Sequence, residues 1–268
     1  MYTLGIVGPD AAAATDRLVA ALDGRVAVLR HLVEDGEGAV RPDPAARADT
    51  TYDLSDGWRA AGDADLPLDD ALDRLAPDHD YALAVGFPAA RVPQVALGDV
   101  EVDNVLVRAA DAAALDPEAV VEALHDQPEH ETLESLVAAV KRSPQADRSG
   151  AIATFTGRVR ARDGDDDAPT EYLEFEMYDG VAERRMRTIE SELEEREGVF
   201  DVAMHHRQGV IPDGEDIVFV VVLAGHRGEA FETVSDGIDR LKDEVPIFKK
   251  EVTAEETFWV HEAERDGT

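Results

Sequence analysis

The expected order of strands and helices changes near the middle of this 268-residue chain. The first half alternates short apolar strands with helices, from a strand at Tyr2 to Val7 to a helix at Pro117 to Leu124. That alternation predicts an α/β fold with a mainly parallel sheet. A polar, proline-bearing stretch follows at residues 125–131. We therefore predict one domain over 1–125, a linker over 126–131 and a second domain over 132–268.

The second half predicts an α+β domain. Residues 151–159 and 172–178 alternate apolar and polar side chains, as half-buried strands do. Ile217 to Ala224 is an unbroken apolar run, typical of a strand buried on both faces. A helix is predicted from about Glu229 to Glu244, because its apolar residues recur at spacings of three and four, and Pro246 ends it.

Charge excludes several classes of function. The 59 acidic residues against 26 basic ones give a net charge of −33, which repels nucleic acid and anionic membranes unless a local basic patch overrides it. The acid is spread evenly and arginine replaces most lysine, which suits a halophile's cytoplasm of molar salt. No signal peptide is visible and no apolar run could span a bilayer, so we expect a cytoplasmic protein. The absence of cysteine excludes disulfides, thiolate metal sites and cysteine nucleophiles.

Lysine is rare and concentrated. The chain has four lysines, and three of them fall between Lys242 and Lys250. Arginine would satisfy the helix dipole at Lys242 equally well, but only a lysine amine readily loses its proton when it is desolvated. Proton transfer and covalent amine chemistry both need that property. The composition therefore favours a functional role for this cluster and an incidental one for Lys141.

Two further cationic pairs could bind an anion. Arg158 and Arg160 share one face of a predicted strand, where they could clamp a phosphate or pair with nearby acid. His226 and Arg227 lie between the buried strand and the following helix, a position that favours anions but also suits an exposed cap.

The adjacent histidines His205 and His206 raise the question of a metal site. Neighbouring strand residues point to opposite faces, and no carboxylate joins the pair at ligand spacing. We therefore expect no metal site at these histidines.

The turn from Gly8 to Thr15 occupies the place of a phosphate-binding loop. Ala13 stands at the second glycine of that pattern and Ala14 at its lysine, so a methyl group blocks close approach and the charge is missing. The domain nevertheless resembles the P-loop accessory protein of molybdopterin guanine dinucleotide synthesis, through residues 56–62 and 85–88. The resemblance implies a retained P-loop-like scaffold with weak or absent nucleotide hydrolysis.

Five ordered motifs of the second half resemble the large, catalytic subunit of molybdopterin synthase. They lie at residues 155–160, 206–209, 225–227, 241–251 and 259–260. The resemblance implies that family's fold and its reaction, in which two sulfurs are added to cyclic pyranopterin monophosphate to form the molybdopterin dithiolene. It also implies a sulfur donor, the C-terminal Gly-Gly thiocarboxylate of a small ubiquitin-like partner, and no cofactor. A chain without cysteine needs such a separate sulfur carrier.

The same resemblance assigns roles to the lysines. Lys242 matches the essential lysine beside the incoming thiocarboxylate, and Lys249 matches a second pocket lysine, with Glu251 flanking it. The family's large subunits form a central dimer with one small subunit at each end. In that heterotetramer, residues of the second large subunit can complete each site.

The resemblance also assigns substrate binding. Arg160, His226 and Arg227 match residues that bind the phosphate and pterin ends of the substrate, while Arg158 and Lys250 flank these positions. Two other functions stay open at this point: a nucleotide-dependent adaptor acting through the first domain, and a non-catalytic module that binds ubiquitin-like tails.

Overall fold

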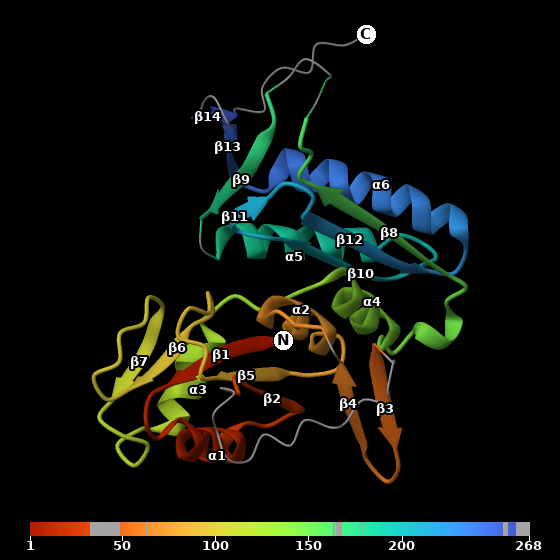
Figure 1. Cartoon of the computed structure of the whole chain (residues 1–268). Coiled ribbons are helices and arrows are strands. Elements are labelled where there is room, and N and C mark those ends of the chain that lie inside the picture. The colour runs from red at the N-terminus through yellow and green to blue at the C-terminus, as the bar shows by residue number, and fades with distance from the viewer. Residues whose placement is uncertain are drawn as a thin grey trace. The chain divides into compact units, whose positions relative to one another are not determined.

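The computed structural model describes residues 1–32, 49–62, 64–162, 164, 168–178, 180–253 and, for the backbone alone, 257–260. The chain divides into two compact units, Met1–His130 and Glu131–Thr268. Figure 1 labels the elements of both. Within the described part of the chain, no helix is long and apolar enough to cross a membrane.

A parallel sheet forms the first unit. Its five strands run in the order β2-β5-β1-β6-β7, and all four ladders are parallel, which confirms the predicted parallel sheet. The strands are β1 (Tyr2–Val7), β2 (Val26–Arg30), β5 (Tyr81–Val85), β6 (Gln94–Leu97) and β7 (Val105–Ala109). The sequence did not predict β6, whose four residues are all buried between β1 and β7.

The described residues of the first unit also form three helices and a hairpin. The helices are α1 (Ala11–Ala21), α2 (Leu68–Leu75) and α3 (Pro117–His125). The hairpin, formed by β3 (Thr50–Leu54) and β4 (Trp58–Gly62), was also not predicted; its turn and second strand hold most of the 56–62 stretch. The predicted loop at 34–50 lies almost wholly outside the described residues.

Two antiparallel sheets form the second unit. One has the strand order β10-β12-β8 and the other β11-β9-β13-β14, with every ladder antiparallel. The strands are β8 (Ala151–Arg158), β9 (Thr170–Met177), β10 (Val199–His206), β11 (Gly209–Pro212), β12 (Asp216–Ala224), β13 (Ile247–Thr253) and β14 (Thr257–Val260). The helices are α4 (Leu133–Lys141), α5 (Val181–Glu194) and α6 (Arg227–Glu244), with a 3-10 turn, η1, at Ala146–Arg148.

β12 is the central strand of its sheet and is covered on both sides, as its apolar run predicts. Alternate residues such as Val220 and Val222 pack with residues of α5 and α6. The residues between them, such as Val221, pack with α4. The other sheet contributes Leu173 and Phe175 to the core that α5 and α6 cover.

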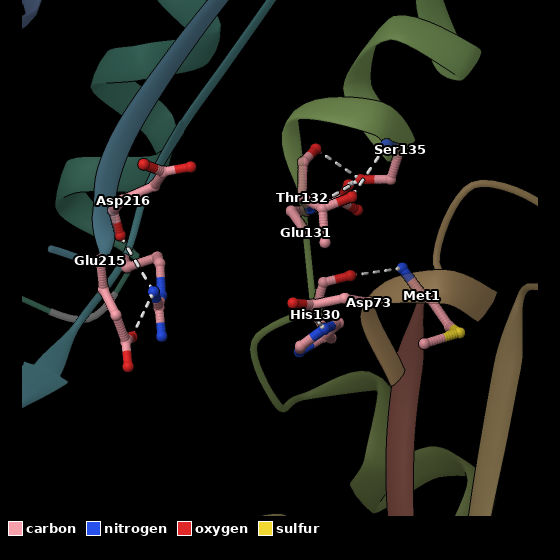
Figure 2. Close-up of polar contacts among 9 residues, drawn as sticks. Met1, Asp73, His130, Glu131, Thr132, Ser135, Glu215 and Asp216 are labelled. Carbon is pink, nitrogen blue, oxygen red and sulfur yellow. Dashed lines mark hydrogen bonds and ion pairs between the residues drawn. The ribbon is translucent and has the colours of Figure 1, made fainter. Parts of the chain in front are cut away.

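The two units meet along the chain at His130 and Glu131. On the first-unit side, the amino group of Met1 donates to Glu129 Oε2 at 2.9 Å. It also donates to the His130 carbonyl at 3.4 Å (Figure 2). On the second-unit side, Thr132 and Ser135 exchange side-chain-to-backbone hydrogen bonds, which form a capping box at the start of α4. Each end of this junction is thus tied to its own unit.

Candidate functional site

Helix α6 carries predicted site residues at both of its ends. β12 ends at Ala224, and His226 then adopts an extended backbone as the N-cap of α6 without a side-chain cap bond. His226 and Arg227 are both exposed. Lys242 lies in the last turn. Because an α-helix rises 1.5 Å per residue, Arg227 and Lys242 are about 22 Å apart along its axis.

Lys242 is exposed, and in the described part of the chain it makes no ion pair or hydrogen bond. Nearby Glu244 is occupied, since it accepts hydrogen bonds from Arg240 at 2.7 Å and from Arg185 of α5. Residues two apart on a helix point to nearly opposite sides. Lys242 therefore points away from the ion-paired side of α6 that faces α5.

Strand β13 places Lys249 and Lys250 on opposite faces of its sheet. Lys249 lies opposite buried Phe175 of β9, on the face that packs against the core, and its ammonium group lies 3.9 Å from Glu251 Oε2. The other oxygen of Glu251 accepts a 2.6 Å hydrogen bond from the Thr170 hydroxyl. Glu251 thus connects half-buried Lys249 to the start of β9.

Lys250 is already bound to a carboxylate. Its ammonium group donates to Glu174 Oε2 at 2.8 Å, directly across from it on β9. This hydrogen bond raises the pKa of Lys250 above its ordinary value. The contact is a cross-strand ion pair of the kind that stabilises a sheet.

Arg158 and Arg160 flank buried Val159 and are both exposed, so they lie on one side of the chain as predicted. Arg158 pairs with Asp216 Oδ1 at 3.0 Å and donates to the Gly214 carbonyl. Arg160 comes directly after Val159, whose backbone amide donates to the Glu215 carbonyl at 2.9 Å.

A third arginine, Arg207, lies between β10 and β11 within the 206–209 motif, and the sequence analysis assigned it no role of its own. Arg207 donates to Glu215 Oε2 at 2.9 Å and to the Asp216 carbonyl at 3.0 Å. Figure 2 shows Glu215 and Asp216 side by side at the turn before β12. The acidic pair directly after Gly214 was the available sequence signal. Its two carboxylates neutralise Arg207 and Arg158, and this fixes the start of β12.

The two histidines of β10 point to opposite faces, as predicted. His205 stacks on Phe219, whereas His206 packs edge-on against Phe175 with ring centroids 4.8 Å apart. Nδ1 of His206 donates to the Arg207 carbonyl at 2.8 Å, and burial lowers the pKa of His206 to about 4. Among the described residues, no group of three or more His, Cys, Asp or Glu side chains could hold a metal ion.

The corresponding turn of the first unit has no comparable groups. α1 begins at Ala11, directly after the three-residue turn 8–10. The Thr15 hydroxyl donates to the Ala11 carbonyl at 2.7 Å, and Ala14 is fully buried in the core. The Thr15 hydroxyl is therefore used in an internal hydrogen bond. The side chain of Ala14, which stands where a phosphate-binding loop has its lysine, is buried in the core.

The predicted site residues form two groups within one chain. Lys242 closes α6, and β13 with Lys249 follows it directly. Thr170 links Arg160 to this end, because its amide donates to the neighbouring Ala161 carbonyl at 2.8 Å and its hydroxyl to Glu251. His226 and Arg227 lie at the other end of α6. Figure 1 shows β13 and the tip of β8 near one end of this helix.

Comparison with known proteins gives consistent matches. A family model described as MoaE protein matches residues 127–244. A probable molybdopterin synthase of Haloferax volcanii is 55% identical over 264 residues, which cover 98% of this chain and 100% of the relative. The molybdopterin synthase catalytic subunit of Pyrococcus abyssi is 37% identical over 134 residues, 50% of this chain and 86% of the subunit.

Solved structures also include sequence relatives of this chain. The molybdopterin biosynthesis MoaE protein of Burkholderia ambifaria is 34% identical, covers 52% of this chain and 89% of its own, and has a TM-score of 0.42. The Haloferax relative matches along both units, whereas the Pyrococcus subunit matches half of the chain.

Proposed function

Since this chain belongs to the molybdopterin synthase family and acts as an enzyme of molybdenum cofactor biosynthesis, we propose that the cations at the two ends of α6 form its sulfur-transfer site. The observation that carries the proposal is the state of Lys242. This lysine is exposed at the end of α6 and has no counter-ion among the described residues, in a chain of net charge −33. An amine kept free of carboxylates in so acidic a protein is available to an incoming anion.

The proposed reaction moves two sulfurs onto cyclic pyranopterin monophosphate. Each sulfur arrives as the thiocarboxylate of a small ubiquitin-like partner, whose C-terminal tail reaches Lys242. When each C–S bond to the pterin side chain forms, a C–O bond at the same carbon breaks and its oxygen leaves. Water then cleaves the acyl–sulfur bond and supplies the oxygen that returns the tail to a carboxylate, so that the sulfur stays on the pterin side chain. Lys242 orients the anionic tail and transfers the protons of these steps.

Lys249 is proposed as the second pocket lysine. Its neighbour Glu251 is held by Thr170, so the 3.9 Å Lys249–Glu251 contact limits where the ammonium group can lie. A preorganised cation binds an anion without first losing side-chain freedom. Glu251 then serves as a positioning residue for Lys249.

The substrate's phosphate and pterin ends are assigned to Arg160, His226 and Arg227. A guanidinium group binds phosphate through a planar pair of N–H donors, and the start of α6 adds backbone N–H groups. Arg158 and Lys250, which are engaged by Asp216 and Glu174, are better suited to holding the sheets than to binding substrate.

The proposed assembly is a dimer of this chain with one small partner at each end. The roughly 22 Å between the two ends of α6 supports this arrangement, because a compact substrate cannot touch both ends of one helix. His226 and Arg227 of a second copy would meet Lys242 of the first.

The first unit is proposed to be a scaffold without nucleotide hydrolysis. Its turn lacks the lysine of a phosphate-binding loop, and the Thr15 hydroxyl is bound to Ala11. The full chain should release no phosphate from GTP above a buffer blank, and sustained release would contradict this part of the proposal.

The deciding experiment measures molybdopterin formation by Lys242→Ala with the thiocarboxylated partner, read as the fluorescent oxidised pterin. Loss of general acid–base help should reduce the rate by at least about 100-fold. Lys141→Ala is the matched control, since Lys141 is also an exposed lysine in the last turn of a helix. A wild-type rate for Lys242→Ala would refute the assignment.

A further inference from the structure

Two lysines that are neighbours on β13 meet carboxylates at different distances. The ammonium group of Lys250 donates directly to Glu174 at 2.8 Å, whereas that of Lys249 stays 3.9 Å from Glu251. The four side chains are buried to a similar extent, with 18 to 30% of each exposed. A direct hydrogen bond from an ammonium group to a carboxylate is about 2.7–2.9 Å long, so the first pair is closed and the second is open.

One of these two carboxylates is held by a hydroxyl group. The Thr170 hydroxyl donates to Glu251 Oε1 at 2.6 Å, a short charge-assisted hydrogen bond, and Thr170 is only 6% exposed. The backbone of Thr170 is also fixed, because its amide donates to the Ala161 carbonyl at 2.8 Å. Among the described residues, no second side chain donates to Glu174. The carboxylate that is held by a hydroxyl is therefore the one that leaves its lysine open.

A register shift in the ladder between β9 and β13 brings the hydroxyl to this place. A regular antiparallel ladder would put Glu171 opposite Thr253, but the register shifts by one residue and Thr170 lies there instead. Because side chains alternate along a strand, Thr253 lies on the same face as Glu251. Such irregularities are known to re-aim side chains next to functional sites. Here the shift replaces a carboxylate on this face by a hydroxyl that can donate to Glu251.

We propose that Thr170 is a positioning residue for the sulfur-transfer reaction, because its hydroxyl keeps Glu251 from closing on Lys249 and so leaves that lysine available to an anion. This proposal rests on the proposed function, which places Lys249 in the pocket. The movement that the hydroxyl prevents is small, from the 3.9 Å of this pair to a distance like the 2.8 Å of the Lys250 pair. A closed pair would compete directly with an anionic substrate or tail for the ammonium group.

Lysine reactivity tests this restraint without using the reaction. Reductive methylation of the full chain with formaldehyde and cyanoborohydride gives a rate for each amine, read by mass spectrometry of fragments that separate the two adjacent lysines. In the wild type, Lys249 should react at least about 3-fold faster than Lys250, because a direct ion pair favours the charged, unreactive form of an amine. Thr170→Val removes the hydroxyl and keeps the shape, so Lys249 should slow to the rate of Lys250.

Conservative variants make the reactivity test specific to the hydroxyl. Thr170→Ser keeps this group and should keep the wild-type rate at Lys249. Thr15→Val is the matched control, since Thr15 is a buried threonine of the first unit whose hydroxyl also donates a hydrogen bond. Lys141 is the internal reference, unfolding midpoints show whether each variant is folded, and Thr170→Ala replaces Thr170→Val if the latter is not. Unchanged reactivity of Lys249 in the folded variant would overturn the proposal.

Turnover then separates this role from the proposed function. Thr170→Val should lower kcat/KM for molybdopterin formation about 10-fold, since a competing ion pair has to open before an anion binds. Thr170→Val/Glu251→Gln lacks the competing carboxylate and should return to the faster rate of Glu251→Gln alone, which a merely structural threonine would not allow. A double variant no faster than Thr170→Val would contradict the positioning role. Wild-type turnover by Lys249→Ala would instead refute the proposed function, while the reactivity test would still decide the restraint.

Discussion

Two strand-to-helix junctions, one in each unit, use the same local architecture and leave different groups exposed. At β1–α1, Gly8 leads into a helix whose first residues are alanines, with Ala14 buried and the Thr15 hydroxyl bound to the Ala11 carbonyl. At β12–α6, His226 and Arg227 are exposed and no side chain caps the helix.

The difference shows that a strand-to-helix turn alone does not make an anion site. Both helix starts offer free backbone N–H groups. Only the second junction adds a cationic side chain and an imidazole, and these are not bound within the described protein. The first junction is a structural element of its core, and the second is a candidate binding element.

The largest expected effect is structural and lies at the first junction. Gly8 has a φ of +131°, and a Cβ there would lie 2.3 Å from the Leu97 carbonyl oxygen. Gly8→Ala should destabilise the first unit by about 4 kcal/mol, because neither backbone can move freely. Urea unfolding followed by circular dichroism measures this. A loss below about 1 kcal/mol would mean that this turn is not tightly packed.

The stability of the second unit should depend on pH through the buried carboxyl group of Glu190. Burial of Glu190 raises its pKa from 4.5 to about 7, so the folded state holds more protons than the unfolded state between these values. This contribution to the free energy of unfolding falls as pH rises through that window, by up to about 3 kcal/mol. Glu190→Gln keeps an acceptor for the Met204 amide without the charge, and should stabilise the second unit at pH 8.

The buried His206 makes stability depend on pH in the opposite direction. Its pKa falls from 6.5 to about 4 on burial, so its contribution to stability is lost as pH drops from 6.5 to 4. In the wild type these two trends oppose one another. Glu190→Gln should therefore show stability that rises from pH 4 to pH 6.5, measured by urea unfolding at each pH. A pH profile identical to wild type would contradict the buried, ionisable Glu190.

Arg227→Ala tests the chemistry of the second junction. Loss of a charged hydrogen bond to phosphate should cost about 2 kcal/mol, or roughly 30-fold in kcat/KM for molybdopterin formation, with stability changed by less than about 0.5 kcal/mol. Thr15→Val, at the matching part of the first junction, should leave kcat/KM unchanged. Equal effects of the two substitutions would remove the distinction between the junctions.

The smallest effect is expected at Gly228, the second residue of α6. A Cβ there meets nothing within 4 Å. Gly228→Ala should stabilise the second unit by up to about 1 kcal/mol, since alanine loses less backbone entropy in a helix. Thermal unfolding of Gly228→Ala and Gly8→Ala under the same conditions compares the two junctions. If Gly228→Ala were destabilised, the second junction would be as crowded as the first.

Much of the fold followed from sequence periodicity, and the exceptions have physical causes. β12 and α6 were predicted because long apolar runs and helical spacing leave few alternatives. β6 was missed because four buried residues after a proline carry too little pattern. The hairpin β3–β4 was missed because its strands are mostly exposed and bury no regular face.

For the candidate site, the sequence proposed the member residues but gave no information on how they are arranged. Motifs identified Lys242, Lys249, Arg160, His226 and Arg227 without showing that they divide between the ends of one helix. Likewise, neighbouring Lys249 and Lys250 differ in role only because strand alternation sends one toward the core and the other to Glu174. Whether each site residue contacts substrate remains a prediction that the variants above test.

The sequence by itself determined which residue types are available to the candidate site: few lysines, gathered mostly in one segment of an acidic chain, and no cysteine. It also determined the strands and helices with long, regular periodicity. Tertiary structure decided which cations are left available, because Arg158, Arg207 and Lys250 are neutralised by carboxylates that lie 8 to 76 positions away along the chain. Local sequence sets side-chain type and spacing, but pairing depends on distances that only the folded chain establishes.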